Sequence, residues 1–248
     1  MATKLELAQL VRDTVAADAQ AASFREPLIG FSSALDPRYT ELPQIVGPWI
    51  APPQFFLPTV ETILSFFVPF AQEIAEANQQ GQQPSRGWAK SYLDANLLIE
   101  KVSQTVIQHL ANQGIVAAAI PPTHTYDEKT LTSAWSHRSA AYIAGLGSFG
   151  VNRMLITKKG CAGRFGSILL AIQLEPDAPA AEENCLYYRD GSCLVCLAQC
   201  PTGALQLNGF DKFQCNARLL ANAAEFTDLG WCDVCGKCLA TPCAVLEK

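Results

Sequence analysis

The chain has 248 residues, 49% of them hydrophobic, which is enough to bury one full core and to carry a small second unit. Its 18 basic and 23 acidic residues give a net charge of −5, so nucleic acid is not an expected partner. The first residues carry charges throughout, which excludes a secretory signal, and no stretch is long and apolar enough for a membrane span. We therefore expect a cytoplasmic protein that makes no membrane contact.

The N-terminal part predicts helices and strands in alternation. A helix is expected over residues 1–20, with Thr3 and Glu6 forming a capping box at its start. Seven prolines between residues 27 and 58 predict a long ordered loop, whose aromatic side chains lie against the core, a cofactor or a second subunit. The apolar run from Thr62 to Val68 predicts a buried strand.

The elements that follow complete one layered domain. In chain order we expect a helix over 88–113 ended by Gly114, a buried strand over 115–120, a helix over 133–144, and a strand pair formed by 154–157 and 167–174. This alternation predicts an α/β or α+β domain over residues 1–176. The acidic, proline-rich segment 176–183 predicts a linker to a second domain over residues 177–248.

Nine of the ten cysteines follow this linker. Disulfides are rare in a reducing compartment, so metal ligation is the expected role of these thiols. The run Cys193-x2-Cys196-x3-Cys200-Pro201 is typical of ferredoxins that hold two [4Fe–4S] clusters. In such a run the cysteine before the proline binds the neighbouring cluster, which predicts a small ferredoxin-like dicluster module.

The spacing also predicts which cysteines share a cluster. Asp190 occupies the position where a first cysteine is expected, so either Cys185 loops back to fill that site or Asp190 itself is the ligand. Cys185 is the predicted ligand, because cubane iron is usually held by four thiolates. The two predicted ligand sets are Cys185, Cys193, Cys196 and Cys243 for one cluster, and Cys200, Cys215, Cys235 and Cys238 for the other.

Three alternatives remain open at this point. Cys232 can replace Cys215 or Cys235, because Cys232 and Cys235 have the same spacing as Cys235 and Cys238. Cys161 stands alone and is expected to be a buried side chain, with a reactive thiol as the alternative. Paired C-x2-C motifs also bind zinc in small structural modules, so two zinc ions are the alternative to two clusters.

A glycine-rich loop matches the dinucleotide fingerprint G-x-G-x-x-G at Gly145, Gly147 and Gly150. The dinucleotide loop follows a strand, whereas this one follows a predicted helix, so a nicotinamide site is not expected. We expect these glycines to cap the helix and to allow a close approach of the backbone.

A family resemblance joins these features. The run RSAAYIAGLGSFGVNRMLIT at 138–157, the following GCAGR and GSILLAIQL, and CPTGAL at Cys200 resemble the epoxyqueuosine reductase family, which is related to the reductive dehalogenases. Over residues 88–243 the resemblance implies a nitroreductase-like domain that binds a corrinoid such as cobalamin and receives electrons from two [4Fe–4S] clusters. The residues expected near this cofactor are Arg138, Gly145, Gly147, Gly150 and Arg164.

The chain departs from that family where the family's proton donor lies. Members that reduce the modified tRNA base carry an acidic residue before the arginine that matches Arg138, but the ungapped count here reaches Leu131. Asp127 lies nearby, so His137, Arg138 and Asp127 are the catalytic candidates. The final motif, with four residues between Cys238 and Cys243, departs from the family pattern as well.

The sequence therefore predicts an iron–sulfur oxidoreductase that passes electrons from two clusters to a cofactor or substrate in the N-terminal domain. Its expected partners are a redox partner protein or a small-molecule substrate, with a homodimer as a further expectation. The alternative is a non-catalytic ferredoxin-like electron carrier or a partner-docking protein. An enzyme needs a deep pocket in the N-terminal domain and a carrier does not.

Overall fold

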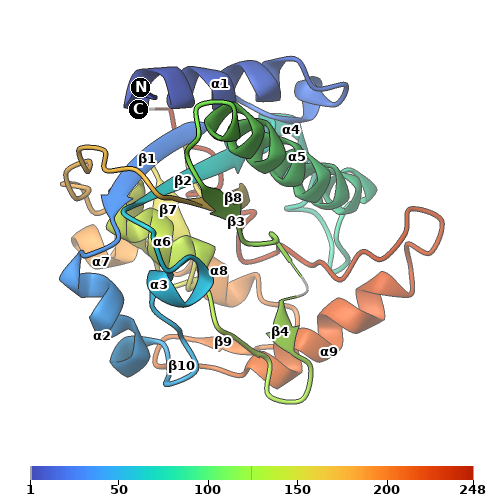
Figure 1. Ribbon diagram of the computed structural model, residues 1–248. Coiled ribbons are helices and arrows are strands. Elements are labelled where there is room, and N and C mark those ends of the chain that lie inside the picture. Colours follow the sequence, from blue (N-terminus) through green and yellow to red (C-terminus); the bar gives the residue numbers. More distant parts are fainter. Residues whose placement is uncertain (1, 124, 248) are drawn as a thin grey trace.

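The computed structural model describes residues 2–123 and 125–247 (Figure 1). Up to residue 119 its elements are α1 (Lys4–Ala16), η1 (Ala21–Ser23), β1 (Leu28–Ser33), α2 (Pro37–Ile45), α3 (Pro53–Phe56), β2 (Thr62–Pro69), α4 (Gln72–Ala77), α5 (Arg86–Ala111) and β3 (Ala117–Ala119). Then follow β4 (Tyr126–Asp127), β5 (Thr132–Ser133), α6 (His137–Ile143), β6 (Gly147–Phe149), β7 (Leu155–Thr157), β8 (Gly163–Leu170), α7 (Leu186–Asp190), α8 (Val195–Ala198), β9 (Leu205–Gln206), β10 (Gly209–Phe210) and α9 (Lys212–Ala223).

The main sheet has the strand order β1-β2-β8-β3 across the described residues, and each neighbouring pair is antiparallel. Every residue of β2 is buried, which confirms the buried strand predicted over 62–68. A strand buried on both faces carries a continuous apolar run rather than an alternating one. The central position of β2, with a layer of helices on each face, explains this burial.

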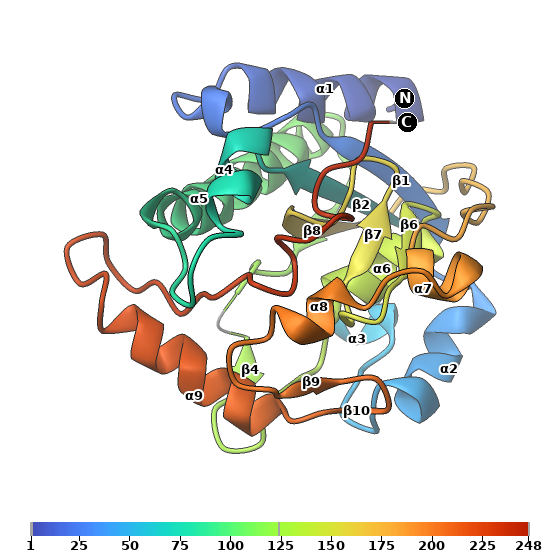
Figure 2. The same ribbon diagram turned by 180° about the vertical axis from the view of Figure 1, so that it is seen from behind.

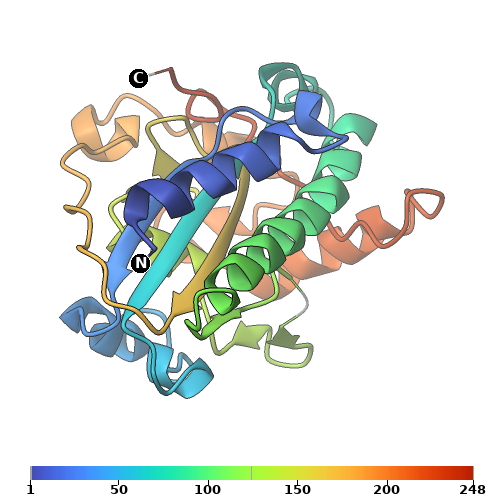
Figure 3. The same cartoon turned by 45° about the horizontal axis from the view of Figure 1, so that its top comes forward.

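Helices α1 and α5 cover one face of the sheet (Figure 3). Leu64, Phe66 and Val68 of β2 point into this layer, where they meet Leu7 of α1 and Leu98 of α5. The N-terminus of α1 has the predicted capping box, in which the Thr3 hydroxyl accepts a hydrogen bond from the backbone N–H of Glu6. Amphipathic spacing therefore predicted both long helices correctly.

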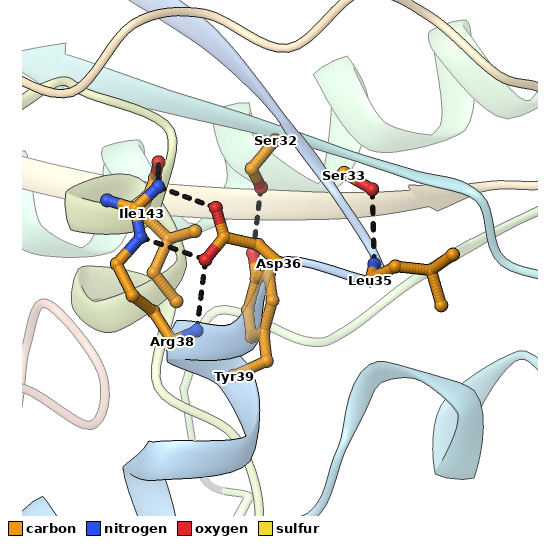
Figure 4. Close-up of polar contacts among 7 residues, drawn as sticks. All are labelled: Ser32, Ser33, Leu35, Asp36, Arg38, Tyr39 and Ile143. Carbon is orange, nitrogen blue, oxygen red and sulfur yellow. Dashed lines mark hydrogen bonds and ion pairs between the residues drawn. The ribbon is translucent and has the colours of Figure 1, made fainter.

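Helix α6 covers the opposite face and is held there by α2. Asp36 caps α2 and forms an ion pair with Arg38, at 2.7 Å between Oδ2 and Nη2 (Figure 4). The same Arg38 amino group donates a hydrogen bond of 2.9 Å to the carbonyl oxygen of Ile143, at the end of α6. Helix α6 begins with the catalytic candidates His137 and Arg138, so this contact helps to fix their position relative to the sheet.

The proline-rich segment 27–58 differs from its prediction as a loop, because it contains β1, α2 and α3. Pro37 and Pro53 both lie in the first turn of a helix, where a missing N–H costs nothing. Leu28–Ser33 forms an edge strand paired with β2. The high density of prolines therefore does not exclude regular structure in this segment.

Three other predicted elements also differ. Residues 154–157 do not pair with 167–174: β7 pairs with β6 in a separate hairpin, and β8 pairs with β2 and β3. The strand predicted over 115–120 is the short, half-buried edge strand β3, and the helix predicted over 133–144 begins only at residue 137. The apolar segments were thus predicted correctly as elements, whereas one pairing and the bounds of the other two elements were wrong.

The C-terminal segment lies beside α6 and the β6–β7 hairpin (Figure 2). The predicted linker is bound to the N-terminal part, since the Asp177 carboxylate accepts 2.8 Å from the backbone N–H of Phe31 and forms an ion pair with Lys4. Cys232 and Val234 belong to the core cluster beneath α5.

The mixed α/β fold class is thus observed, while the boundary at residues 176 and 177 stays a prediction. None of the helices within the described residues has the length and apolar character needed to cross a membrane.

Candidate metal centre and ligand cavity

One small hollow is bordered by Cys185, Cys193, Cys196 and Cys243, which we call the first cysteine group. Cys185 lies immediately before α7 and Cys196 lies in α8, so two short helices and the end of the chain meet here. Val151 and Ile156 of the β6–β7 hairpin form the apolar wall. These four cysteines are the set that the spacing predicted for one cluster.

The other predicted set, Cys200, Cys215, Cys235 and Cys238, forms the second cysteine group. Burial, with a smaller effect of the charges of Cys235 and Cys200, raises the pKa of Cys215 in α9 to about 11. Burial also raises the pKa of Cys238 to about 12, with added effects from the three other cysteines of the group. The charges of Cys200, Cys215 and Cys235 thus act on Cys238, although 37 residues of sequence lie between Cys200 and Cys238.

The two groups are adjacent, and their chemistry suits a metal cluster. The pKa of Cys238 is also raised by the charge of Cys196 in the first group. Burial raises the pKa of Cys196 itself to about 11. Buried cysteines whose thiolate charges would repel one another stay protonated at neutral pH. A bound metal cation offsets those negative charges, so the cysteines lose their protons when they bind it. Soft thiolate sulfurs suit iron–sulfur clusters and zinc alike.

Within residues 2–123 and 125–247, no three cysteine, histidine or carboxylate side chains converge closely enough to hold one metal ion. The first group instead surrounds a hollow. Thiolates that bind a cubane hold separate corners of it, whereas those of a zinc site meet at a single ion.

Two residues that the spacing left open lie outside the groups. Asp190 is exposed, and its carboxylate accepts hydrogen bonds from its own turn at Ser192. Cys232 is fully buried in the main core, where its Sγ lies 3.8 Å from the carbonyl oxygen of Ala89. Neither residue is among those described around the hollow of the first group.

Cys161 contacts the first group directly. Its Sγ lies 3.7 Å from the Sγ of Cys243, and its backbone N–H donates 3.0 Å to the Cys243 carbonyl oxygen. The hydrogen bond between the two thiols lowers the pKa of Cys243 and raises the pKa of Cys161. Burial raises the pKa of Cys161 further. Cys161 also lines a second, larger cavity, so it lies between that cavity and the first group.

This larger cavity has a volume of about 660 Å³, within the range of small-molecule sites. Its walls come from the α2–α3 connection, the β4–β5 hairpin, α6, β8 and the start of α9. Aromatic side chains are prominent in the lining: Trp49, Tyr126, Trp135, Phe165 and Phe210. Spacing in the sequence gave no sign of this assembly, except that Trp49 was expected to lie against the core, a cofactor or a second subunit.

His137 lines the cavity, but both of its ring nitrogens are engaged by the protein. Its Nε2 lies 3.1 Å from the carbonyl oxygen of Pro121, and its Nδ1 lies 2.9 Å from Oγ of Ser167. A carbonyl only accepts, so the proton is assigned to Nε2 and Nδ1 accepts from the serine hydroxyl. Burial lowers the pKa of His137 to about 4, so the ring is neutral at physiological pH.

Arg138 and Arg164 also line the cavity. Arg138 donates through Nη1 to the carbonyl oxygen of Arg153, at 3.1 Å, and to the sulfur of Met154. Arg164 donates through Nη2 to the carbonyl oxygen of Pro122, at 3.0 Å. Burial lowers the pKa of both guanidinium groups, and the charge of Arg164 lowers that of Arg138 further. The two cations therefore lie close enough to repel each other.

The acidic candidate Asp127 is the exposed last residue of β4, directly before the turn to β5. Its carboxylate accepts from the backbone N–H groups of Lys129 and Thr130, so it stabilises its own turn. Leu131, at the position where the relatives' acid was expected, does line the cavity and has φ of +51°. The expectation that Asp127 acts in catalysis therefore gains no support from its position.

The glycines of the 145–150 loop contact the protein itself and are not among the described cavity-lining residues. Gly145, at φ +77°, donates to the carbonyl of Tyr142, and Leu146 donates to that of Ala141, which is a Schellman cap on α6. A Cβ on Gly147 would lie 2.2 Å from the carbonyl oxygen of Ile156. These glycines thus allow close packing of the hairpin, and their predicted place in a cofactor pocket gains no support.

Comparisons with known proteins agree with the resemblance in the sequence. No protein-family profile matches the chain. An epoxyqueuosine reductase of Staphylococcus aureus is 28% identical over 173 residues, covering 63% of this chain and 39% of that protein. The solved epoxyqueuosine reductase of Streptococcus thermophilus has a TM-score of 0.55 and 21% identity, over 84% of this chain and 55% of that one.

A second kind of relative shares the fold. The catabolic reductive dehalogenase NpRdhA has a TM-score of 0.54 at 14% identity, over 76% of this chain and 26% of that one. The chain thus spans well under two thirds of each of these relatives. The predicted resemblance is confirmed: in sequence and fold the chain resembles the epoxyqueuosine reductases, and in fold it also resembles a reductive dehalogenase.

Proposed function

We propose that the chain is an iron–sulfur oxidoreductase, in which two [4Fe–4S] clusters deliver electrons to a ligand bound in the large cavity. The observation that carries this proposal is Cys161, which contacts Cys243 of the first cysteine group and also lines the cavity. An electron source and a ligand site are thereby separated by one side chain. When bound, the clusters supply single electrons at low potential.

We assign the first cluster to Cys185, Cys193, Cys196 and Cys243, and the second to Cys200, Cys215, Cys235 and Cys238. The hollow within the first group and the mutual charge effects within the second support these sets. The burial of Cys232 against Ala89 supports Cys235 as the ligand in its place. Zinc in the same sites remains the alternative, and metal analysis separates the two.

The cavity side chains would bind and orient the ligand. Trp49 and Trp135 offer flat aromatic surfaces, while Arg138 and Arg164 offer hydrogen-bond donors. A large planar cofactor, such as a corrinoid, fits the flat aromatic surfaces. His137 is neutral and uses both ring nitrogens within the protein, so its role is to position α6 against Ser167.

Cofactor binding tests this proposal against the electron-carrier alternative. Anaerobically purified protein is titrated with cobalamin and, separately, with flavin mononucleotide, while the cofactor absorbance is followed. We expect one of them to bind saturably and to be reduced by the dithionite-reduced protein. If neither cofactor binds while the clusters still reduce reversibly, the carrier reading is correct.

A pair of variants locates this binding. Thr132→Trp adds bulk inside the cavity, because Thr132 is among its lining residues. Glu128→Trp adds the same side chain at an exposed position on the adjoining turn. We expect only Thr132→Trp to weaken cofactor binding, by about tenfold or more, since overpacking costs about 1–3 kcal/mol.

Two predictions about partners belong to this proposal. The net charge of −5 argues against nucleic acid. A solved epoxyqueuosine reductase structure contains a tRNA stem loop, however, so this expectation stays a prediction. Electrophoretic mobility shift with a tRNA pool tests it, and we expect no shifted band at physiological salt. The homodimer also stays a prediction, which light scattering tests.

A further inference from the structure

The large cavity is cationic. Among its described lining residues the charged side chains are Arg138, Arg164 and Lys212, and no aspartate or glutamate is among them. His137 is neutral and adds no charge, and Leu131 places an apolar side chain at the position where an acid was expected. A water-filled cavity with basic walls attracts and concentrates anions.

The two arginines have donors to spare. The hydrogen bonds of Arg138 to other described residues all come from Nη1. Arg164 donates from Nη2 to Pro122, and no hydrogen bond joins its Nη1 to another described residue. Buried guanidinium donors without partners are costly, and a ligand that accepts from them removes that cost.

The nearest acid to Arg164 is already in use. The guanidinium lies over the ring of Tyr92, 4.5 Å from its centroid. The Tyr92 hydroxyl donates 2.6 Å to Asp233, and this carboxylate acts on Arg164 only from a distance. Asp233 is not one of the described cavity-lining residues, so the cavity side of Arg164 faces no protein carboxylate.

We propose that the cavity binds a small organic anion, whose carboxylate or phosphate oxygens lie between Arg138 and Arg164. Planar guanidinium groups match such oxyanions with paired hydrogen bonds. The aromatic walls at Trp49, Trp135 and Phe165 receive the remainder of the ligand. This inference rests on the proposed function: the anion is the substrate that receives the electrons, whereas the corrinoid proposed above is the cofactor, and the two arginines select the chemical class of the substrate.

Benzoate and its uncharged isostere benzamide test the inference by calorimetry. Both are titrated into cluster-loaded, anaerobic protein at constant ionic strength. We expect benzoate to bind about tenfold more tightly than benzamide, because charge-assisted hydrogen bonds are stronger than neutral ones. Phenyl phosphate, as a third ligand, shows whether the site prefers phosphate to carboxylate. Equal affinities for the anions and benzamide would overturn the inference.

Variants assign the preference to the arginines. Arg164→Gln and Arg138→Gln should each remove most of the preference for benzoate, whereas Arg164→Lys should keep part of it. Arg12→Gln, a matched change on α1 next to Glu26, should leave it unchanged. A preference that survives both glutamine variants would contradict the proposal. Circular dichroism and iron content, measured on each variant, separate a lost anion site from a lost fold or a lost cluster.

Discussion

Both ring nitrogens of His137 are bound within the protein, and this determines how the residue responds to pH. Its pKa is lowered by burial from 6.5 to about 4. The unfolded chain therefore takes up a proton at a pH where the folded chain does not. The contribution of His137 to stability is fully present above pH 6.5 and is lost as the pH falls towards 4.

We predict that His137→Gln makes the free energy of unfolding less dependent on pH between 6.5 and 4. Carboxylates with lowered pKa, such as Asp36, also lose their contribution in acid, but they do so equally in both proteins. The difference between the two curves, measured by denaturant unfolding, isolates the histidine. Parallel curves over this range would show that His137 is not held neutral by the fold.

Lys237 shows how one residue links the second cysteine group to the N-terminal part. It lies between Cys235 and Cys238 and is only 1% exposed. Its ammonium donates to the carbonyl oxygens of Asn78, at 2.8 Å, and Gln80, at 2.7 Å. Removing it leaves two carbonyl oxygens without their donor.

We predict that Lys237→Met lowers the free energy of unfolding by about 2 kcal/mol. For a chain of this size that is a fall in apparent Tm of about 4–8 °C. Thermal melts of both proteins under the same anaerobic conditions measure it. Lys158→Met, at an exposed position, is the control and should change little. An equal Tm for both variants would contradict the proposed link.

At the scale of the elements, long amphipathic segments were predictable and short paired ones were not. Helices α1 and α5 and strand β2 followed from hydrophobic spacing, because each buries one broad face or both faces. The β6–β7 hairpin was missed because Gly147 belongs to a glycine-rich loop that was interpreted as a helix cap, so no strand was expected at 147–149 to pair with 155–157.

Glycines at turns test how tightly the elements pack around the second group. Gly236 has φ of +69°, and a Cβ there would lie 2.1 Å from the indole ring of Trp88. Gly114 has a similar φ of +74°, but a Cβ there would meet nothing within 4 Å. The two positions therefore share the conformational penalty and differ only in the collision.

We predict that Gly114→Ala costs about 1–2 kcal/mol, the penalty of a left-handed conformation with a side chain. Gly236→Ala should cost clearly more and should reduce the bound iron, since Gly236 lies between Cys235 and Cys238. Denaturation curves and iron content of the two variants measure the contrast. Equal losses would show that Trp88 yields to the added methyl group.

On the scale of the whole molecule, the chain brings distant segments together in two places. Cysteine spacing predicted two ligand sets, because the C-x2-C-x3-C-P run has a known crossover, and this assignment stays a prediction. The cavity was not predictable in this way, since Trp49, Trp135, Arg164 and Lys212 come from four separate segments. Only the completed fold places them around one space.

The C-terminal segment is also more integrated than a separate module would be. Cys232, Val234 and Ala244 share a core cluster with Trp88 and other residues of α5. The backbone of Cys161 is hydrogen-bonded to Cys243 and Ala244. We therefore expect loss of a cluster to destabilise the N-terminal part as well.

The most direct test of the account is the metal content of cysteine variants purified without oxygen. The parent protein should contain about eight irons and eight sulfides, as two cubanes require. Cys243→Ala and Cys215→Ala should each lose about four irons, while Cys232→Ala and Cys161→Ala should keep about eight. Zinc in place of iron, or full iron in both Cys243→Ala and Cys215→Ala, would contradict the account.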